Sequence, residues 1–195
     1  MNTYGDAAHN QAVFNIFKTA MNHYNATHDF SQYDNDGDGF IDSVTLLYNG
    51  PNTGWGSFWW AYQWSFFVND AATTTWDGKK IKKFVFQFIS KRGTGNTDVD
   101  PKVLCHEMGH LLGLADYYDY TPSQNPRGGI GGLDMMDANK GNHNAFSRWV
   151  LDWINPIVVG SGAPTLRTLN ASGDTSLVGN KAVVIFPNAS NPFSQ

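Results

Sequence analysis

The chain has 195 residues, of which 41% are hydrophobic and 15% are charged, and its formal net charge is −4. These values are typical of one globular domain, or of one domain and part of a second, and they exclude a highly charged disordered chain. The acidic balance argues against a nucleic-acid partner. We expect no membrane span, because no apolar run reaches the roughly 20 residues that cross a bilayer. The single cysteine, Cys105, excludes a disulfide within the chain.

The first half of the chain predicts a helix, an acidic loop and two strands. Apolar residues recur at helical spacing over about residues 9–26, which predicts an amphipathic helix. An acidic loop at 34–42 follows, and then a strand at 43–48. The aromatic-rich segment 55–68 is expected to pack inside the protein. Alternation over 79–90 predicts a half-buried strand with a solvated basic edge formed by Lys79, Lys80, Lys82 and Lys83.

The second half predicts two further helices and a strand-rich end. Asp100 is typical of a helix N-cap, and Pro101 is typical of the first helical position. Gly113 is typical of a left-handed residue after a helix, so the helix is expected to end at Leu112. A glycine-rich loop spans 121–132. Apolar residues over 146–153 predict another helix, closed by Asn155 and Pro156, and the residues after it predict short strands.

The predicted helix that begins at Pro101 carries the pattern His106-Glu107-Met108-Gly109-His110. Residues four apart lie on one face of a helix, so both imidazoles can bind one zinc ion. Glu107, the only glutamate in the chain, can take a proton from a zinc-activated water. The rest of the helix is apolar and predicts burial in the core, at Leu104, Cys105, Met108, Leu111 and Leu112.

A catalytic zinc site needs a third protein ligand. No second glutamate is available, and Gly113 allows a sharp turn that brings Asp116 back toward the histidines. The layout is HExxHxxGxxD. Asp119 is the alternative third ligand.

Three segments resemble the immune inhibitor A family of secreted bacterial metallopeptidases. They are YDNDGDGFIDSVTLLYNG, then HEMGHLLGLADYYD, then GGLDMMD followed by AFSRWVLDWINP, and together they span about residues 28–160. The resemblance implies an α+β, metzincin-like domain at 1–156, with a mixed twisted sheet packed on the active-site helix. Residues 157–195 would begin a β-rich region. It further implies zinc ligation by His106, His110 and Asp116, with Glu107 as general base.

The same resemblance implies a methionine turn and a substrate-binding strand. Met136 would form the hydrophobic floor beneath the metal, with Met135 as the alternative. The strand at 84–89 would pair with extended substrate. No tyrosine lies two residues after either methionine, so the oxyanion must be stabilised by zinc, by main-chain donors or by another residue. The candidates, which the sequence does not rank, are His143, Tyr117 and Tyr118.

The acidic loop matches the first part of an EF-hand calcium loop. Its positions 1, 3, 5 and 9 are aspartates, position 6 is glycine, and position 7 offers a main-chain carbonyl. Thr45 stands where the bidentate glutamate of an EF-hand would be, and a strand follows instead of a helix. We therefore predict a structural calcium site between helix and strand, with the ligands Asp34, Asp36, Asp38, Phe40 and Asp42.

The leading hypothesis is a secreted, monomeric zinc endopeptidase with bound calcium that cleaves proteins or peptides. No signal peptide is seen at the start of the chain, and a pro-segment would lie outside it. One alternative is a calcium-stabilised surface or adhesion module with an inactive or structural zinc site. An intact Glu107 argues against that alternative, because a structural site does not need it. Another is a zinc hydrolase acting on a non-peptide bond.

Overall fold

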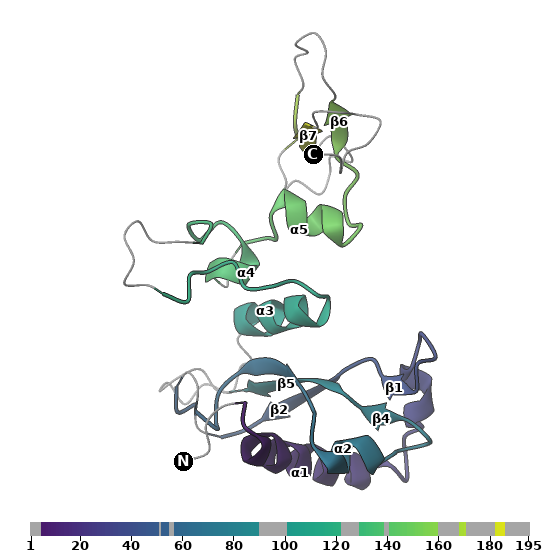
Figure 1. Ribbon diagram of the computed structural model, residues 1–195. Helices are drawn as coiled ribbons and strands as arrows, with labels where there is room; N and C mark the ends of the chain where they lie inside the picture. The colour runs from purple at the N-terminus through teal and green to yellow at the C-terminus, as the bar shows by residue number, and fades with distance from the viewer. Residues whose placement is uncertain are drawn as a thin grey trace. The chain divides into compact units, whose positions relative to one another are not determined.

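The structure, a computed structural model, describes residues 5–50, 52–54, 57–89, 101–121, 129–138, 141–159, 168–170 and 182–185. The chain forms two compact units, Met1–Ala115 and Asp116–Gln195. The protein belongs to the α+β class, with helices and small sheets (Figure 1). The predicted N-cap Asp100 lies outside the described residues.

The first unit is built on a three-stranded mixed sheet. Strand β5 (Lys83–Phe88) lies between β2 (Val44–Tyr48), which is parallel to it, and β3 (Tyr62–Ser65), which is antiparallel. Every residue of β5 from Phe84 to Phe88 is buried. The prediction of a half-buried strand was therefore wrong, because helices cover β5 on both faces.

Helix α1 (Ala7–Tyr24) covers one face of this sheet, close to the predicted helix. Asp6 caps its first turn by accepting a hydrogen bond from the His9 N–H. The buried ring of Phe17 lies 5.1 Å from that of Phe84 on β5, measured between ring centroids. Aromatic side chains therefore form much of the core, which confirms the packing role predicted for part of segment 55–68 through Ala61, Tyr62 and Phe66.

A second, two-stranded sheet lies beside the acidic loop. Strand β1 (Phe40–Ile41) pairs in parallel with β4 (Lys80–Ile81), and the 3-10 helix η1 (Phe30–Tyr33) precedes the loop. The strand predicted at 79–90 is thus divided into β4 and β5, which belong to different sheets. A short helix, α2 (Asn69–Thr73), follows β3.

Helix α3 (Pro101–Leu111) covers the opposite face of the three-stranded sheet and contacts β3 and β5 (Figure 1). Gly113 follows it with a φ of 95°, which confirms the left-handed turn. The burial predicted for its apolar residues was wrong in part. The helix buries the polar His106 and Glu107, whereas Cys105, Met108 and Leu112 are exposed.

The second unit contains α4 (Met135–Ala138), α5 (Ala145–Val150) and a parallel pair formed by β6 (Ile157–Val159) and β7 (Val183–Ile185). Asn144 caps α5 by accepting a hydrogen bond from the Ser147 N–H. The helix ends at Val150, earlier than predicted. The unit boundary falls after Ala115, and the start of a β-rich region at 157 stays a prediction.

No described helix has both the length and the apolar character needed to cross a bilayer.

Candidate functional site

The histidines of the predicted metal motif face one another on α3. Their Nε2 atoms are 3.1 Å apart, and His106 is only 5% exposed. Tetrahedral ligands held 2.0–2.1 Å from zinc are separated by about 3.3 Å, so this spacing suits one shared ion. Asp116 follows Ala115 directly, and one ligand atom from each of His106, His110 and Asp116 lies within 4.8 Å of the others.

The ring of His110 is oriented by the turn that follows the helix. Its Nδ1 lies 2.8 Å from the main-chain oxygen of Leu114, and because a carbonyl only accepts, Nδ1 carries the proton. In a neutral imidazole this leaves the lone pair on Nε2, the atom that faces His106. The positive φ of Gly113 makes this close return of the chain possible. In metal-binding histidines, the ring nitrogen that does not bind the metal typically donates a hydrogen bond to a main-chain oxygen or a carboxylate.

Glu107, the predicted general base, is buried against the sheet. It is 8% exposed, and its Oε2 accepts a hydrogen bond of 2.7 Å from the main-chain N–H of Gln63 on β3. The carboxylate is therefore tied to a strand that lies 44 residues earlier in the sequence.

Asp116, the predicted third ligand, is held within its own unit by an aromatic hydroxyl. Tyr120 donates a short hydrogen bond to Asp116 Oδ2. Asp119, the alternative ligand, accepts a hydrogen bond of 2.7 Å from the Thr121 N–H, and it is not in the three-residue cluster. The geometry therefore favours Asp116 over Asp119.

Of the two methionines, Met136 suits the predicted turn better. It is fully buried, and its main-chain oxygen accepts a hydrogen bond of 2.8 Å from the N–H of Tyr117, the residue after Asp116. The turn is fixed by the buried Asp134, whose carboxylate accepts the Met136 N–H at 2.7 Å.

The three oxyanion candidates have different surroundings. The hydroxyl of Tyr117 is 2.9 Å from Ser147 Oγ, and the ring of His143 packs on Trp153 while its Nδ1 lies 3.7 Å from Asp134. Both are thus engaged within the second unit. Burial, together with the charge of Asp116, raises the pKa of Tyr118. Tyr118 thus lies beside the predicted ligand Asp116, whereas Tyr117 and His143 contact other groups.

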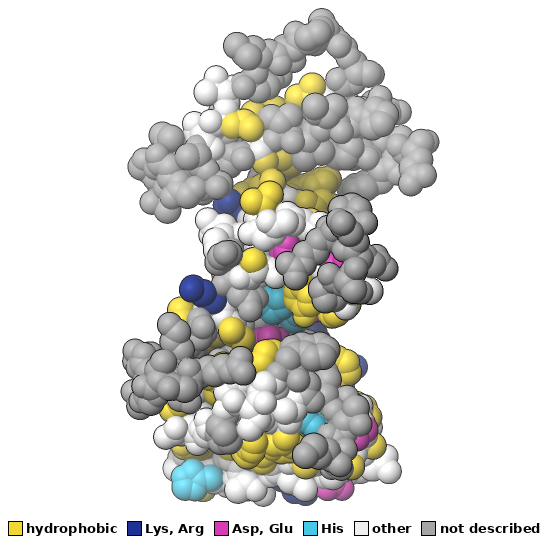
Figure 2. Space-filling model, turned by 90° about the vertical axis from the view of Figure 1, so that its left-hand side faces the viewer, with side chains coloured by type: hydrophobic (Ala, Val, Ile, Leu, Met, Phe, Trp, Pro, Cys, Tyr) yellow, Lys and Arg dark blue, Asp and Glu magenta, His cyan; other side chains and the backbone are white. Residues whose placement is uncertain are grey.

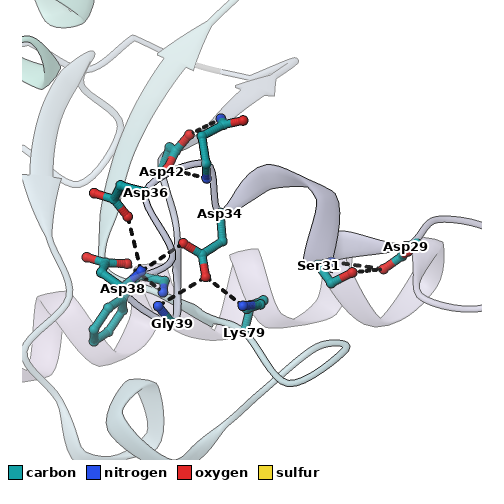
Figure 3. A network of polar contacts seen from close by, with 10 residues as sticks. Asp29, Ser31, Asp34, Asp36, Asp38, Gly39, Asp42 and Lys79 are labelled. Atoms are coloured by element: carbon teal, nitrogen blue, oxygen red, sulfur yellow. Dashed lines mark hydrogen bonds and ion pairs between the residues drawn. The ribbon is translucent and has the colours of Figure 1, made fainter.

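The acidic loop folds around its first aspartate (Figure 3). The buried side chain of Asp34 accepts hydrogen bonds from the main-chain N–H groups of Asp38 and Gly39, at 3.1 and 3.0 Å. Carboxylate oxygens of Asp34, Asp36 and Asp42 lie within 4.8 Å of one another. Three of the predicted calcium ligands are thus brought together.

The fourth carboxylate and the main-chain ligand are placed differently. Asp38 is not in the three-residue group, and its Oδ1 accepts the N–H of Phe40 at 2.8 Å. The oxygen of Phe40 stays a predicted ligand.

Lys79, the residue before β4, contacts the acidic loop. Lys79 Nζ lies 2.6 Å from Asp34 Oδ2, and this hydrogen bond lowers the pKa of Asp34 while burial opposes the shift. The prediction of a wholly solvated basic edge was therefore wrong for Lys79. Lys82 lies over the ring of Phe40, 5.6 Å from its centroid, and Lys83 is exposed. On the face drawn in Figure 2, described Lys and Arg side chains are scattered and form no continuous patch.

The strand predicted to pair with substrate is not at an edge. β5 has neighbours on both sides, so its main-chain groups are used within the sheet. The edge strand that contacts α3 is β3. Any pairing with an extended peptide next to α3 therefore falls to β3, and the prediction for 84–89 was wrong.

A scan against protein-family models finds no match, and a search of curated proteins finds no significantly similar sequence.

Sequence reasoning missed three groups at these sites: the Gln63 N–H, the Tyr120 hydroxyl and the Lys79 ammonium. Tyr120 lies four residues after Asp116 and could have been found by its proximity in sequence. The other two contacts join residues more than 40 positions apart, and nothing in their local sequence marks them.

Proposed function

We propose that the protein is a zinc-dependent endopeptidase similar to the secreted immune inhibitor A metallopeptidases, as its motifs suggest. The main support is the arrangement on α3. Two imidazole Nε2 atoms lie 3.1 Å apart, the Nδ1 atom of His110 is bound to the Leu114 oxygen, and the residue directly after His106 provides a buried carboxylate. Two histidines and an aspartate are a donor set that zinc accepts.

The chemistry would divide between the ion and Glu107. Zinc, when bound, polarises water and the substrate carbonyl. Glu107 removes a proton from the attacking water and then delivers it to the leaving amine, so that the peptide C–N bond breaks. The new acid then gives up its second water-derived proton, which leaves a carboxylate and an ammonium terminus. Burial at 8% exposure keeps this carboxylate in a defined place.

Strand β3 is the proposed binding edge for an extended peptide substrate. It is an edge strand and contacts α3, the helix that carries the histidines. Its far end is closed to a substrate, because the Ser65 oxygen accepts a hydrogen bond of 3.0 Å from the buried amide of Asn10. Pairing would thus be limited to the part of β3 before Ser65.

The acidic loop is the proposed structural calcium site. Oxygen ligands from several carboxylates suit calcium, and the three that converge come from positions 1, 3 and 9 of the loop. The loop lies between η1 and β1, so an ion there would join the first helical region to the sheets.

Hydrolysis of an unfolded protein tests this proposal. The purified chain, supplied with zinc and calcium, should cleave the substrate at internal bonds, contain one zinc per chain, and lose activity with a zinc-selective chelator. A chain that binds zinc without cleaving would favour the adhesion module. A chain that binds no zinc would contradict the ligand assignment.

Tyr120→Phe is expected to weaken zinc binding by about 10- to 100-fold, because partners of metal ligands contribute that much to metal affinity. The change removes the hydroxyl that donates to Asp116 and keeps the ring. Competition against a chromophoric zinc chelator measures the dissociation constant. Tyr24→Phe, at an exposed tyrosine on α1, is the matched control. Equal zinc affinity in the two variants would show that the Tyr120 hydroxyl does not support the ligand.

Lys79→Met is expected to tighten calcium binding on the order of 10-fold. Lys79 places a positive charge 2.6 Å from Asp34, and calcium affinity depends on the charges around the ion. Isothermal titration with calcium measures the effect. Lys83→Met removes the same charge from an exposed position on β5. If both variants tighten binding equally, net charge is responsible and the Lys79 contact is not.

A further inference from the structure

Strand β3 turns part of its main chain away from the sheet. In an antiparallel pair, the N–H groups of successive residues alternate between facing the partner strand and facing away. Gln63 is opposite Val85, and its N–H donates to the side chain of Glu107. Ser65, two residues later, directs its main-chain oxygen to Asn10. Both contacts are consistent with Gln63 and Ser65 facing outward.

The contact between Gln63 and Glu107 joins the edge strand to the metal helix. The N–O distance is 2.7 Å, which is short for a main-chain donor and typical of a charged acceptor. A glutamate side chain has three rotatable bonds, so a main-chain donor that binds one of its oxygens restricts its orientation. A general base must be held within about 0.5 Å of its working position.

We propose that the main-chain N–H of Gln63 is the positioning group for the general base Glu107. This inference rests on the proposed endopeptidase function and deepens it. The N–H holds Oε2, so the carboxylate keeps one orientation. Because the donor is a main-chain group, any residue except proline can provide it at position 63. Because the Gln63 N–H donates to Glu107, it is not available to pair with a substrate bound along β3.

The test compares Gln63→Pro with Gln63→Ala in the full chain. Both variants lack the glutamine side chain, and only proline lacks the N–H. Proline is tolerated in edge strands where the N–H faces outward. We expect kcat for the proline variant to be about 10- to 100-fold below that of the alanine variant, with equal KM and equal zinc content. Equal kcat values would overturn the inference.

A second comparison removes the N–H without adding a ring. Gln63→Leu is compared with a chain that carries the α-hydroxy acid of leucine at position 63, where an ester oxygen replaces the N–H. The same ratio of kcat values is expected. This pair decides the question if Gln63→Pro lowers the melting temperature or the zinc content.

The Glu107→Asp background separates positioning from a general effect on the strand. The shorter carboxylate cannot reach the N–H, so the ratio between the proline and alanine variants should fall to within about twofold. A ratio that persists would show that the N–H acts through β3 and not through Glu107. A wild-type chain that does not hydrolyse protein would instead overturn the proposed function, and this inference with it.

Discussion

Glu107→Ala is expected to lower the rate of protein hydrolysis by about 10²- to 10⁴-fold while the chain keeps one zinc, because a positioned general base contributes that much. The residues proposed to hold the zinc are His106, His110 and Asp116, so removing Glu107 leaves this group intact. Hydrolysis of an unfolded protein substrate gives the rate, and metal analysis gives the zinc content of each variant.

Two further variants sharpen this comparison. Glu107→Gln keeps an oxygen that can accept the Gln63 N–H but cannot take a proton, so it should be as inactive as alanine. Cys105→Ala changes an exposed residue of the same helix and should retain activity. Loss of zinc in Glu107→Ala would show that the glutamate supports the metal site. Retained activity in Glu107→Gln would assign the base to another group.

The arrangement of the two histidines on α3 could be predicted because its geometry is local. His106 and His110 are four residues apart, and one helical turn brings them together whatever the rest of the chain does. The acidic loop is local in the same way, since its aspartates lie within nine residues. The left-handed Gly113 also follows from a local rule for helix ends. These elements carry most of the proposed chemistry.

What could not be predicted depends on contacts between distant segments. Alternating phenylalanines suggest one buried face for β5, but Val85 and Gln87 are buried too because α3 covers the other face. Whether a strand is central or at an edge depends on its partners, which a single sequence does not reveal. The Gln63 contact uses a main-chain group, so it leaves no trace in the side chain at that position.

These two kinds of information meet at Glu107. Local spacing places Glu107 on the helix that carries both histidines, and a long-range contact with the Gln63 N–H binds one of its carboxylate oxygens. In the proposed mechanism the helix provides two of the metal ligands, and strand β3 adds the orientation that general-base catalysis needs.

Asp34→Ala is expected to abolish the stabilisation of the protein by calcium. Calcium at 100 times its dissociation constant adds about 2.7 kcal/mol to a folded chain that binds it, which corresponds to a rise in Tm of roughly 5–10 °C at this size. Asp34 stands at position 1 of the loop, and two main-chain N–H groups of the loop bind its buried carboxylate. Its loss removes both a ligand and the centre of the loop.

Thermal unfolding with calcium and with a calcium-selective chelator measures this difference in Tm for each variant. Asp70→Ala removes the same charge from an exposed position on α2. Because the acidic loop is unchanged in this variant, calcium should raise its Tm as much as it raises that of the wild type. A similar rise in Asp34→Ala and in the wild type would place calcium elsewhere. No rise in the wild type would mean that the aspartates form a hydrogen-bonded turn and that Lys79, at 2.6 Å, is the cation that the loop uses.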